Sequence, residues 1–184
     1  MQLLRVRKTH IKQLVKKILI ENNIQSPYVR IEDIVKNIGI ELIEEDANDD
    51  IAGFLIKNYD EKTAIIGVNK NHKPNRRRFT IAHELGHFFL HNYEGVHFDG
   101  KHSGSQMFLR DEKSTKGTDI EEREANLFAA ELLMPEILLQ KDIAKINEIY
   151  FIDEDPKLKK LASDYRVSTQ ALTFRLANLG YLTL

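Results

Sequence analysis

The pentad His83-Glu84-Leu85-Gly86-His87 constrains this chain more than any other feature, because its spacing has a mechanical meaning on a helix. At 3.6 residues per turn, residues four apart lie about 40° apart around the axis, so His83 and His87 point the same way. Two neutral imidazoles placed like this can bind one zinc ion. Glu84 flanks His87 on that face, where its carboxylate can reach a water bound to the metal without binding the metal itself. The pentad therefore predicts a helix with a metal-binding face.

The opposite side of this helix is apolar and carries Ile81, Leu85, Phe88 and Phe89. We predict a helix over about residues 76–91, with one side packed in a core and the other facing a cleft. His91 shares the metal face but lies two turns from His83, so we expect it beside the cleft rather than as a ligand. The alternative interpretation is an amphipathic helix with two surface histidines, unless the chain supplies a third ligand.

Composition limits what that ligand can be. The 184 residues include no cysteine, which excludes disulfides and any Cys-ligated zinc or iron–sulfur site and leaves His, Asp and Glu as the good ligands. The net charge of -1 gives no general attraction to nucleic acid or to anionic membrane. No apolar run approaches the roughly 20 residues of a membrane span, so we expect a cytoplasmic protein of one domain, or one domain with a small appendage.

The chain before the pentad alternates helical and strand patterns. Two helices are predicted, a basic amphipathic one over 3–22 and a second from Ser26-Pro27 to Ile38, with Gly39 as its cap. Strands are predicted at 40–43 and, as a hairpin, at 51–56 and 63–69. The hairpin can supply an edge strand for an extended substrate, or simply support the helix behind it. Arg76, Arg77 and Arg78 can bind an acidic partner, but we favour pairing with carboxylates of the same chain or solvation.

The third ligand is expected on a later helix. Residues 94–119 are polar and rich in glycine, which predicts a long loop that is either a lid or an insertion. A helix over about 119–134 follows, capped by Thr118 or Asp119 and ended by Pro135. Glu122 projects from the face of this helix that is rich in small residues. Asn126, one turn further on, is placed to hold a metal ligand in position. The residues alone leave Glu122 and Glu124 open as the third ligand.

The remaining chain is predicted to be helical. An amphipathic helix over 136–149 is followed by a break at 153–156 and by the outline of a helix-turn-helix. Its second helix carries a single arginine, Arg175, which is a thin electrostatic footprint for DNA. We therefore favour a packing or partner-docking unit over a DNA-binding one.

Three stretches together resemble the ImmA/IrrE family of zinc metallopeptidases. They are Arg78-Phe79-Thr80-Ile81-Ala82-His83-Glu84-Leu85-Gly86-His87, Glu122-x-x-Ala125-Asn126-x-Phe128-Ala129-Ala130-Glu131-Leu132-Leu133-Met134-Pro135 and, less specifically, Val167-Ser168 to Arg175-Leu176. The resemblance implies an α+β, mostly helical metallopeptidase domain, with a small sheet packed beside the His-Glu-x-x-His helix and a helical C-terminal segment. It implies one Zn2+ held by His83, His87 and Glu122, with Glu124 as the alternative to Glu122.

The same resemblance implies a function. Members of the family cleave helix-turn-helix transcriptional repressors and so derepress genes of mobile elements or stress responses. We expect a zinc endopeptidase with Glu84 as general base, a metallopeptidase domain over 1–150 and a helix-turn-helix-like subdomain over 151–184. The partner is expected to be a repressor protein, with no direct nucleic-acid binding. Two alternatives stay open: a non-proteolytic zinc-containing binding module, and a DNA-binding regulator that uses the C-terminal segment.

Overall fold

A four-stranded mixed sheet and the helix beside it organise the fold. The computed structural model describes residues 5–58, 60–92, 95–100, 112–146 and 155–181. The elements in these residues are α1 (Lys8–Glu21), α2 (Ile31–Asn37), β1 (Glu41–Glu45), β2 (Ile51–Asn58), β3 (Thr63–Asn69), α3 (Pro74–Leu90), β4 (Gly95–Gly100), α4 (Glu112–Leu133), α5 (Glu136–Ile143), α6 (Pro156–Tyr165) and α7 (Thr169–Asn178).

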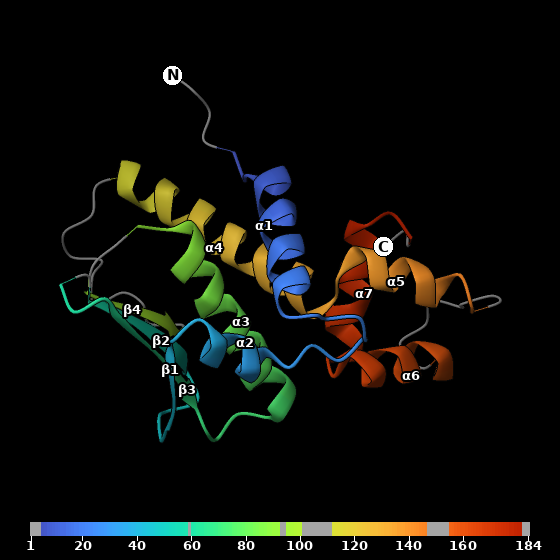
Figure 1. Cartoon of the computed structure of the whole chain (residues 1–184), viewed down its shortest axis with the longest axis horizontal. Coiled ribbons are helices and arrows are strands. Elements are labelled where there is room, and N and C mark those ends of the chain that lie inside the picture. Colours follow the sequence, from blue (N-terminus) through green and yellow to red (C-terminus); the bar gives the residue numbers. More distant parts are fainter. Residues whose placement is uncertain (1–4, 59, 93–94, 101–111, 147–154, 182–184) are drawn as a thin grey trace.

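The sheet has the strand order β1-β3-β2-β4 (Figure 1). β1 pairs with β3 in parallel, whereas β2 pairs antiparallel with both β3 and β4. Helix α3 contacts β2 and β3 on one side and α4 on the other, so it is the central layer between the sheet and the remaining helices. The predicted α+β class and the hairpin of β2 and β3 are confirmed.

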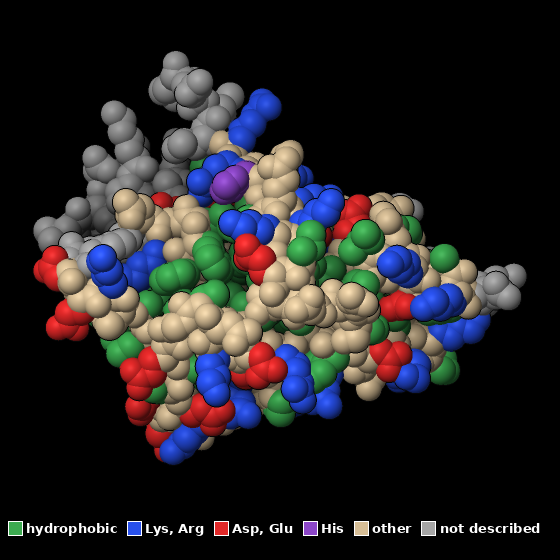
Figure 2. Space-filling model, in the orientation of Figure 1, with side chains coloured by type: hydrophobic (Ala, Val, Ile, Leu, Met, Phe, Trp, Pro, Cys, Tyr) green, Lys and Arg blue, Asp and Glu red, His purple; other side chains and the backbone are tan. Residues whose placement is uncertain are grey.

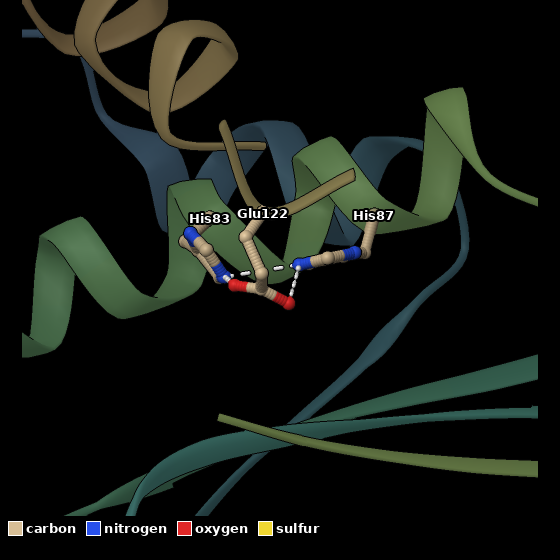
Figure 3. Close-up of side chains that lie close together, drawn as sticks. All are labelled: His83, His87 and Glu122. Atoms are coloured by element: carbon tan, nitrogen blue, oxygen red, sulfur yellow. Dashed lines mark hydrogen bonds and ion pairs between the residues drawn. The ribbon is translucent and has the colours of Figure 1, made fainter. Parts of the chain in front are cut away.

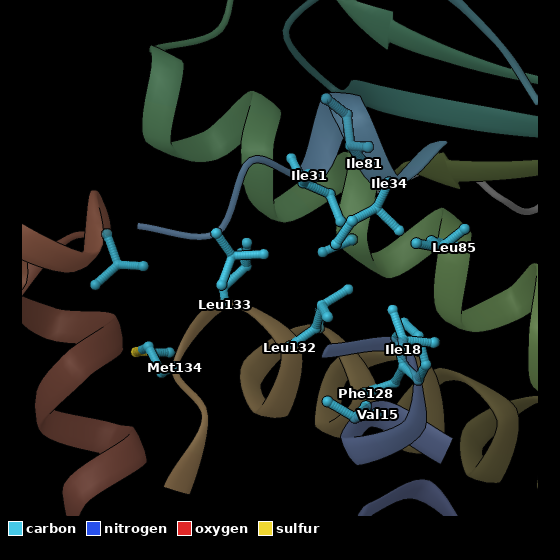
Figure 4. Close-up of a cluster of buried hydrophobic side chains, with 14 of the residues drawn as sticks. Val15, Ile18, Ile31, Ile34, Ile81, Leu85, Phe128, Leu132, Leu133 and Met134 are labelled. Carbon is cyan, nitrogen blue, oxygen red and sulfur yellow. The ribbon is translucent and has the colours of Figure 1, made fainter. Parts of the chain in front are cut away.

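Helix α3 is buried on nearly all sides, as a central layer requires. It begins with Pro74, whose fixed backbone suits the first helical turn, and ends at His91, which is extended. Ile81 and Leu85 pack with α2 residues such as Ile34 and α4 residues such as Phe128, as Figure 4 shows. Apolar residues four and seven positions apart on α1, such as Ile11, Val15 and Ile18, cover α4 from outside.

Gly86 permits the close approach of α3 and α4. A Cβ atom at this position would lie 3.0 Å from the Cα of Ala125 and 3.2 Å from its carbonyl oxygen. Both atoms are backbone, so they can yield only if the two helices move apart. Packing therefore favours glycine here, although alanine is the better helix former.

We expect Gly86→Ala to destabilise the protein despite the gain in helix propensity. The propensity gain is up to about 1 kcal/mol, whereas overpacking against backbone costs about 1–3 kcal/mol. Thermal unfolding of the metal-free protein measures the difference, with Asn75→Ala in the exposed first turn of α3 as the control. An increase in Tm for Gly86→Ala would show that the helices separate at little cost.

Several sequence expectations need correction at element boundaries. α1 begins at Lys8 rather than near residue 3, and α2 begins at Ile31, well after Pro27. The predicted loop over 94–119 is wrong in part: it contains the edge strand β4, and α4 begins at Glu112 instead of at Thr118 or Asp119. Residues 101–111 of that predicted loop lie outside the described residues.

The reason for these errors is that both missed segments lack an apolar signal of their own. β4 is only six residues long, and its pairing with β2 aligns Val96 with Ile56 and Phe98 with Phe54. The first two turns of α4 contain only charged, hydroxyl and glycine residues. Periodicity detects neither, because it depends on repeated apolar positions.

The C-terminal helices α6 and α7 form the predicted helix-turn-helix outline. Asp155 caps α6 and Ser168 caps α7, with Arg166 in the left-handed conformation between them. Buried residues of both helices, such as Tyr165 and Leu172, belong to the same hydrophobic core as α3 and α4. The predicted helix over 136–149 is shorter than expected, since α5 ends at Ile143, and residues 147–154 lie outside the described residues. The division at residue 150 stays a prediction.

Some of the charged side chains form ion pairs within the chain. Arg77 contacts Glu44 at 2.8 Å and Arg78 contacts Glu32 at 3.8 Å, which confirms pairing of these arginines within the chain. On the face in Figure 2, acidic and basic side chains alternate around a central region where hydrophobic side chains gather. In the part of the chain that the structure describes, no helix is both long and apolar enough to cross a membrane.

Candidate metal centre

Three predicted metal ligands converge between α3 and α4. The Nε2 atoms of His83 and His87 lie 3.0 Å apart. The carboxylate of Glu122 reaches across from α4, with Oε2 at 3.3 Å from His83 Nε2 and Oε1 at 3.4 Å from His87 Nε2 (Figure 3). The histidine side chains are almost fully buried, whereas the Glu122 side chain is 36% exposed, so the cluster opens to solvent on the glutamate side.

These distances fit one small cation. Ligand atoms about 2.0–2.1 Å from a tetrahedral zinc lie roughly 3.3 Å from one another, close to the three separations seen here. Each residue offers one ligand atom, and all of these atoms lie within 4.8 Å of one another. Burial lowers the pKa of His87 to about 3, so this imidazole is neutral and able to donate a lone pair.

The outer nitrogens of both histidines are also engaged. His83 Nδ1 lies 3.1 Å from Asn126 Oδ1, and His87 Nδ1 lies 3.0 Å from His91 Nδ1. The amide oxygen of Asn126 can only accept, which places a proton on Nδ1 of His83 and leaves its Nε2 available to a metal. The contact that the sequence predicted for Asn126 is therefore present.

Glu124 lies outside the cluster and has another partner. Its Oε2 is 3.2 Å from His91 Nε2, and its Oε1 accepts hydrogen bonds from the backbone and side chain of Arg7 at 2.8 and 3.0 Å. Burial opposes ionisation of Glu124, but the hydrogen bonds from Arg7 outweigh it and lower the pKa to about 2. A continuous chain thus runs from His87 through His91 and Glu124 to Arg7, which also donates to the carbonyl oxygen of Leu90.

Glu84 and His97 complete the surroundings of the cluster. Glu84 is fully buried, and its Oε2 lies 3.5 Å from Nδ1 of His97 on the edge strand β4. The other ring nitrogen of His97 lies 3.2 Å from Glu122 Oε1. Burial opposes charging of His97, but these two carboxylates outweigh it and raise its pKa to about 9. His97 therefore contacts both Glu84 and Glu122.

The sequence did not identify His97. It lies in the segment predicted as a loop, and only the pairing of β4 with β2 brings it to the site. A single histidine in a polar segment carries no signal of its own. The flanking Val96 and Phe98, which alternate with it, are the one feature that hinted at a strand.

The histidines around Glu122 keep its side chain ionised. Burial itself opposes ionisation, but the contacts with the side chains of His83, His87 and His97 outweigh it and hold the pKa of Glu122 well below its ordinary range. The glutamate is thus a carboxylate at neutral pH, which is the form that binds a metal ion.

A buried lysine holds the other end of α3. Lys57 of β2 donates to the carbonyl oxygens of Phe88 and His91 at 2.9 and 2.8 Å. These carbonyls at the end of a helix have no partner within the helix, and a cation is favoured there by the helix dipole. Burial lowers the pKa of Lys57 to about 8. The sheet is therefore fixed directly to the helix that carries both histidines.

In this helix-rich α+β fold, both histidines of a His-Glu-x-x-His pentad lie beside a glutamate from a later helix. This is the architecture of the His-Glu-x-x-His class of metallopeptidases. Within that class, the chain belongs to the peptidase M78 family, described as the IrrE N-terminal-like domain, whose sequence model matches residues 35–177. The matched region includes the pentad, Glu122 and most of the C-terminal helices.

Two similar proteins extend this result. The chain is 30% identical over 150 residues to the uncharacterized immunity region protein 2 of Bacillus phage phi105, which covers 77% of this chain and 84% of that protein. The fold of this chain is similar to that of a Mycobacterium tuberculosis transcriptional regulator. The TM-score is 0.61, the sequence identity is 17%, and the match covers 92% of this chain. The chain spans only 46% of that regulator.

Proposed function

We propose that this protein is a zinc-dependent endopeptidase that cleaves a helix-turn-helix transcriptional repressor in the cytoplasm. One observation carries the proposal: His83, His87 and Glu122 converge on one point beside the buried carboxylate of Glu84. Membership of a metallopeptidase family agrees with that arrangement.

The residues divide the work of hydrolysis. His83, His87 and Glu122 would hold the zinc ion, which supplies a Lewis acid that lowers the pKa of water and polarises the scissile carbonyl. Glu84 takes a proton from the attacking water and passes it to the leaving amine. Because Glu84 is buried in the helix that also carries both histidines, its carboxylate is held at a fixed position relative to them.

The surrounding contacts keep these groups in place. His97 lies against both Glu84 and Glu122, and so restrains the two carboxylates on the open side of the cluster. Asn126 and His91 orient the histidine rings from behind. Among the described residues β4 pairs with β2 alone, and its other edge can pair with the backbone of an extended substrate.

A relative supports the proposed substrate class, and the C-terminal helices bear on the alternative of DNA binding. A relative from a phage immunity region is consistent with control of a phage-type repressor. Direct binding of DNA is less well supported, because Arg175 of α7 is 3% exposed and is paired with Glu131 of α4. The single arginine of α7 is thus buried in an ion pair within the protein.

Incubation with the helix-turn-helix repressor encoded beside its gene tests the proposal. We expect cleavage in the presence of zinc and loss of cleavage with a chelator, restored when zinc is added back, as measured by mass spectrometry of the fragments. A stable complex without cleavage would favour a binding module. A salt-sensitive shift of DNA by this protein alone would favour a DNA-binding regulator.

A further inference from the structure

An apolar pocket lies where the C-terminal helices meet α3 and α4. It encloses about 500 Å³, and we call it the junction pocket. Its apolar lining includes Phe79 of α3, Leu133 and Met134 at the end of α4, and Val167 and Ala171 of the α6–α7 unit. Figure 4 shows Leu133 and Met134 at this end of α4, close to the C-terminal helices. The pocket is large enough to receive a large aliphatic or aromatic side chain.

The junction pocket and the candidate metal centre are both lined by residues of α3 and α4. Phe79 lies one turn before His83 on the same face of α3, and the centroids of the two rings are 6.3 Å apart. On α4, Leu133 lies eleven residues after Glu122, within about 20° of it around the helix axis. The faces of α3 and α4 that carry the cluster therefore both extend to this pocket.

The rim of the pocket is basic. Lys73 and Arg76 line it at the start of α3, and both are exposed. Among the described residues, no carboxylate lies within salt-bridge distance of either side chain, whereas the neighbouring Arg77 and Arg78 are each paired. The first turn of α3 also has no acidic residue to offset the positive end of the helix dipole. An acidic group beside the pocket would meet favourable charge.

We propose that the junction pocket binds a large apolar side chain of the protein substrate, next to an acidic residue of the same substrate. This inference rests on the proposed peptidase function and adds the substrate preference that it lacks. Along the helices the lining residues lie about 6–16 Å from the cluster, which is roughly two to five residues of extended peptide from the scissile bond. The C-terminal helices thereby become part of substrate recognition.

Two kinds of variant change the junction pocket independently. Ala171→Trp places an indole in the pocket, and Ala144→Trp at the exposed end of α5 is its control. The double variant Lys73→Glu/Arg76→Glu reverses the rim charge at exposed positions, with Lys16→Glu on α1 as the control. Because the rim variant replaces no buried side chain, it tests the proposal even if Ala171→Trp fails to fold.

Cleavage of a proteome-derived peptide library, read by mass spectrometry, gives the first readout. We expect sites with a large apolar residue and an adjacent acidic residue at a fixed distance from the cut. Ala171→Trp should lower kcat/KM for those sites about tenfold or more, and the rim variant should remove or reverse the acidic preference. Cleavage with no such preference, unchanged in both variants, overturns the pocket proposal and leaves the peptidase function intact.

Binding gives a second readout that does not depend on catalysis. The zinc-loaded Glu84→Gln protein is used to select from a random peptide library displayed on phage. Selected peptides that carry the apolar–acidic pair and are lost with Ala171→Trp support the pocket, even if the wild-type protein cleaves nothing and the peptidase function fails. If neither selection nor cleavage yields the pair, the pocket proposal is overturned.

Discussion

Glu84→Gln is expected to abolish peptide hydrolysis while leaving the metal bound. General-base catalysis contributes about 10²–10⁴-fold to such reactions, and the amide of glutamine accepts no proton from water at neutral pH. We therefore expect kcat to fall by at least about 100-fold. Metal analysis of the purified variant should give the same zinc content as the wild type, because Glu84 is not one of the three converging ligands.

The two measurements separate a catalytic role from a structural one. Glutamine has the same shape as glutamate, so the fully buried position should remain filled and the Tm should not fall. Glu121→Gln, on the neighbouring helix α4, is the matched control and should keep full activity. Substantial hydrolysis by Glu84→Gln, with zinc bound, would mean that another group accepts the proton.

The histidine pair of the candidate metal centre and the glutamate between them could be predicted because these residues are close in sequence. His83, Glu84 and His87 lie within five residues, where helical geometry alone fixes their relative positions. Glu122 and Asn126 are also one turn apart on a single helix, so the helix pattern placed them on one side, but it did not separate Glu122 from Glu124. The hairpin of β2 and β3 was predictable for the same reason, since its register depends on one short turn.

The rest of the site depends on contacts between distant segments. His97 reaches the cluster only through the pairing of β4 with β2, and Arg7 reaches Glu124 across 117 residues of sequence. Neither residue has a neighbour pattern that marks its destination. Glu122 and Glu124 differ in sequence by two positions, which is about 200° around a helix, so only the direction of α4 decides which one faces the histidines.

Replacement of Glu122 and of Glu124 should have opposite effects, and the contrast tests the assignment of the third ligand. Glu122→Ala removes one of three converging ligand groups, and we expect zinc affinity to fall by more than about 100-fold, the upper end of what is lost with residues that only support a ligand. Because Glu122 is partly exposed, the stability of the metal-free protein should change by less than about 1 kcal/mol.

Glu124→Ala should instead destabilise the fold and spare the metal. It leaves Arg7 and His91 without the carboxylate that joins them, and for a group as buried as His91 the loss of a hydrogen-bond partner costs about 1–3 kcal/mol. Zinc affinity should fall by no more than about tenfold, since Glu124 is separated from His87 by the ring of His91. Competition with a chromogenic chelator and thermal unfolding without metal give the two quantities. If zinc affinity collapsed in Glu124→Ala and survived in Glu122→Ala, Glu124 would be the ligand, and the arrangement of His83, His87 and Glu122 would not describe the metal-bound protein.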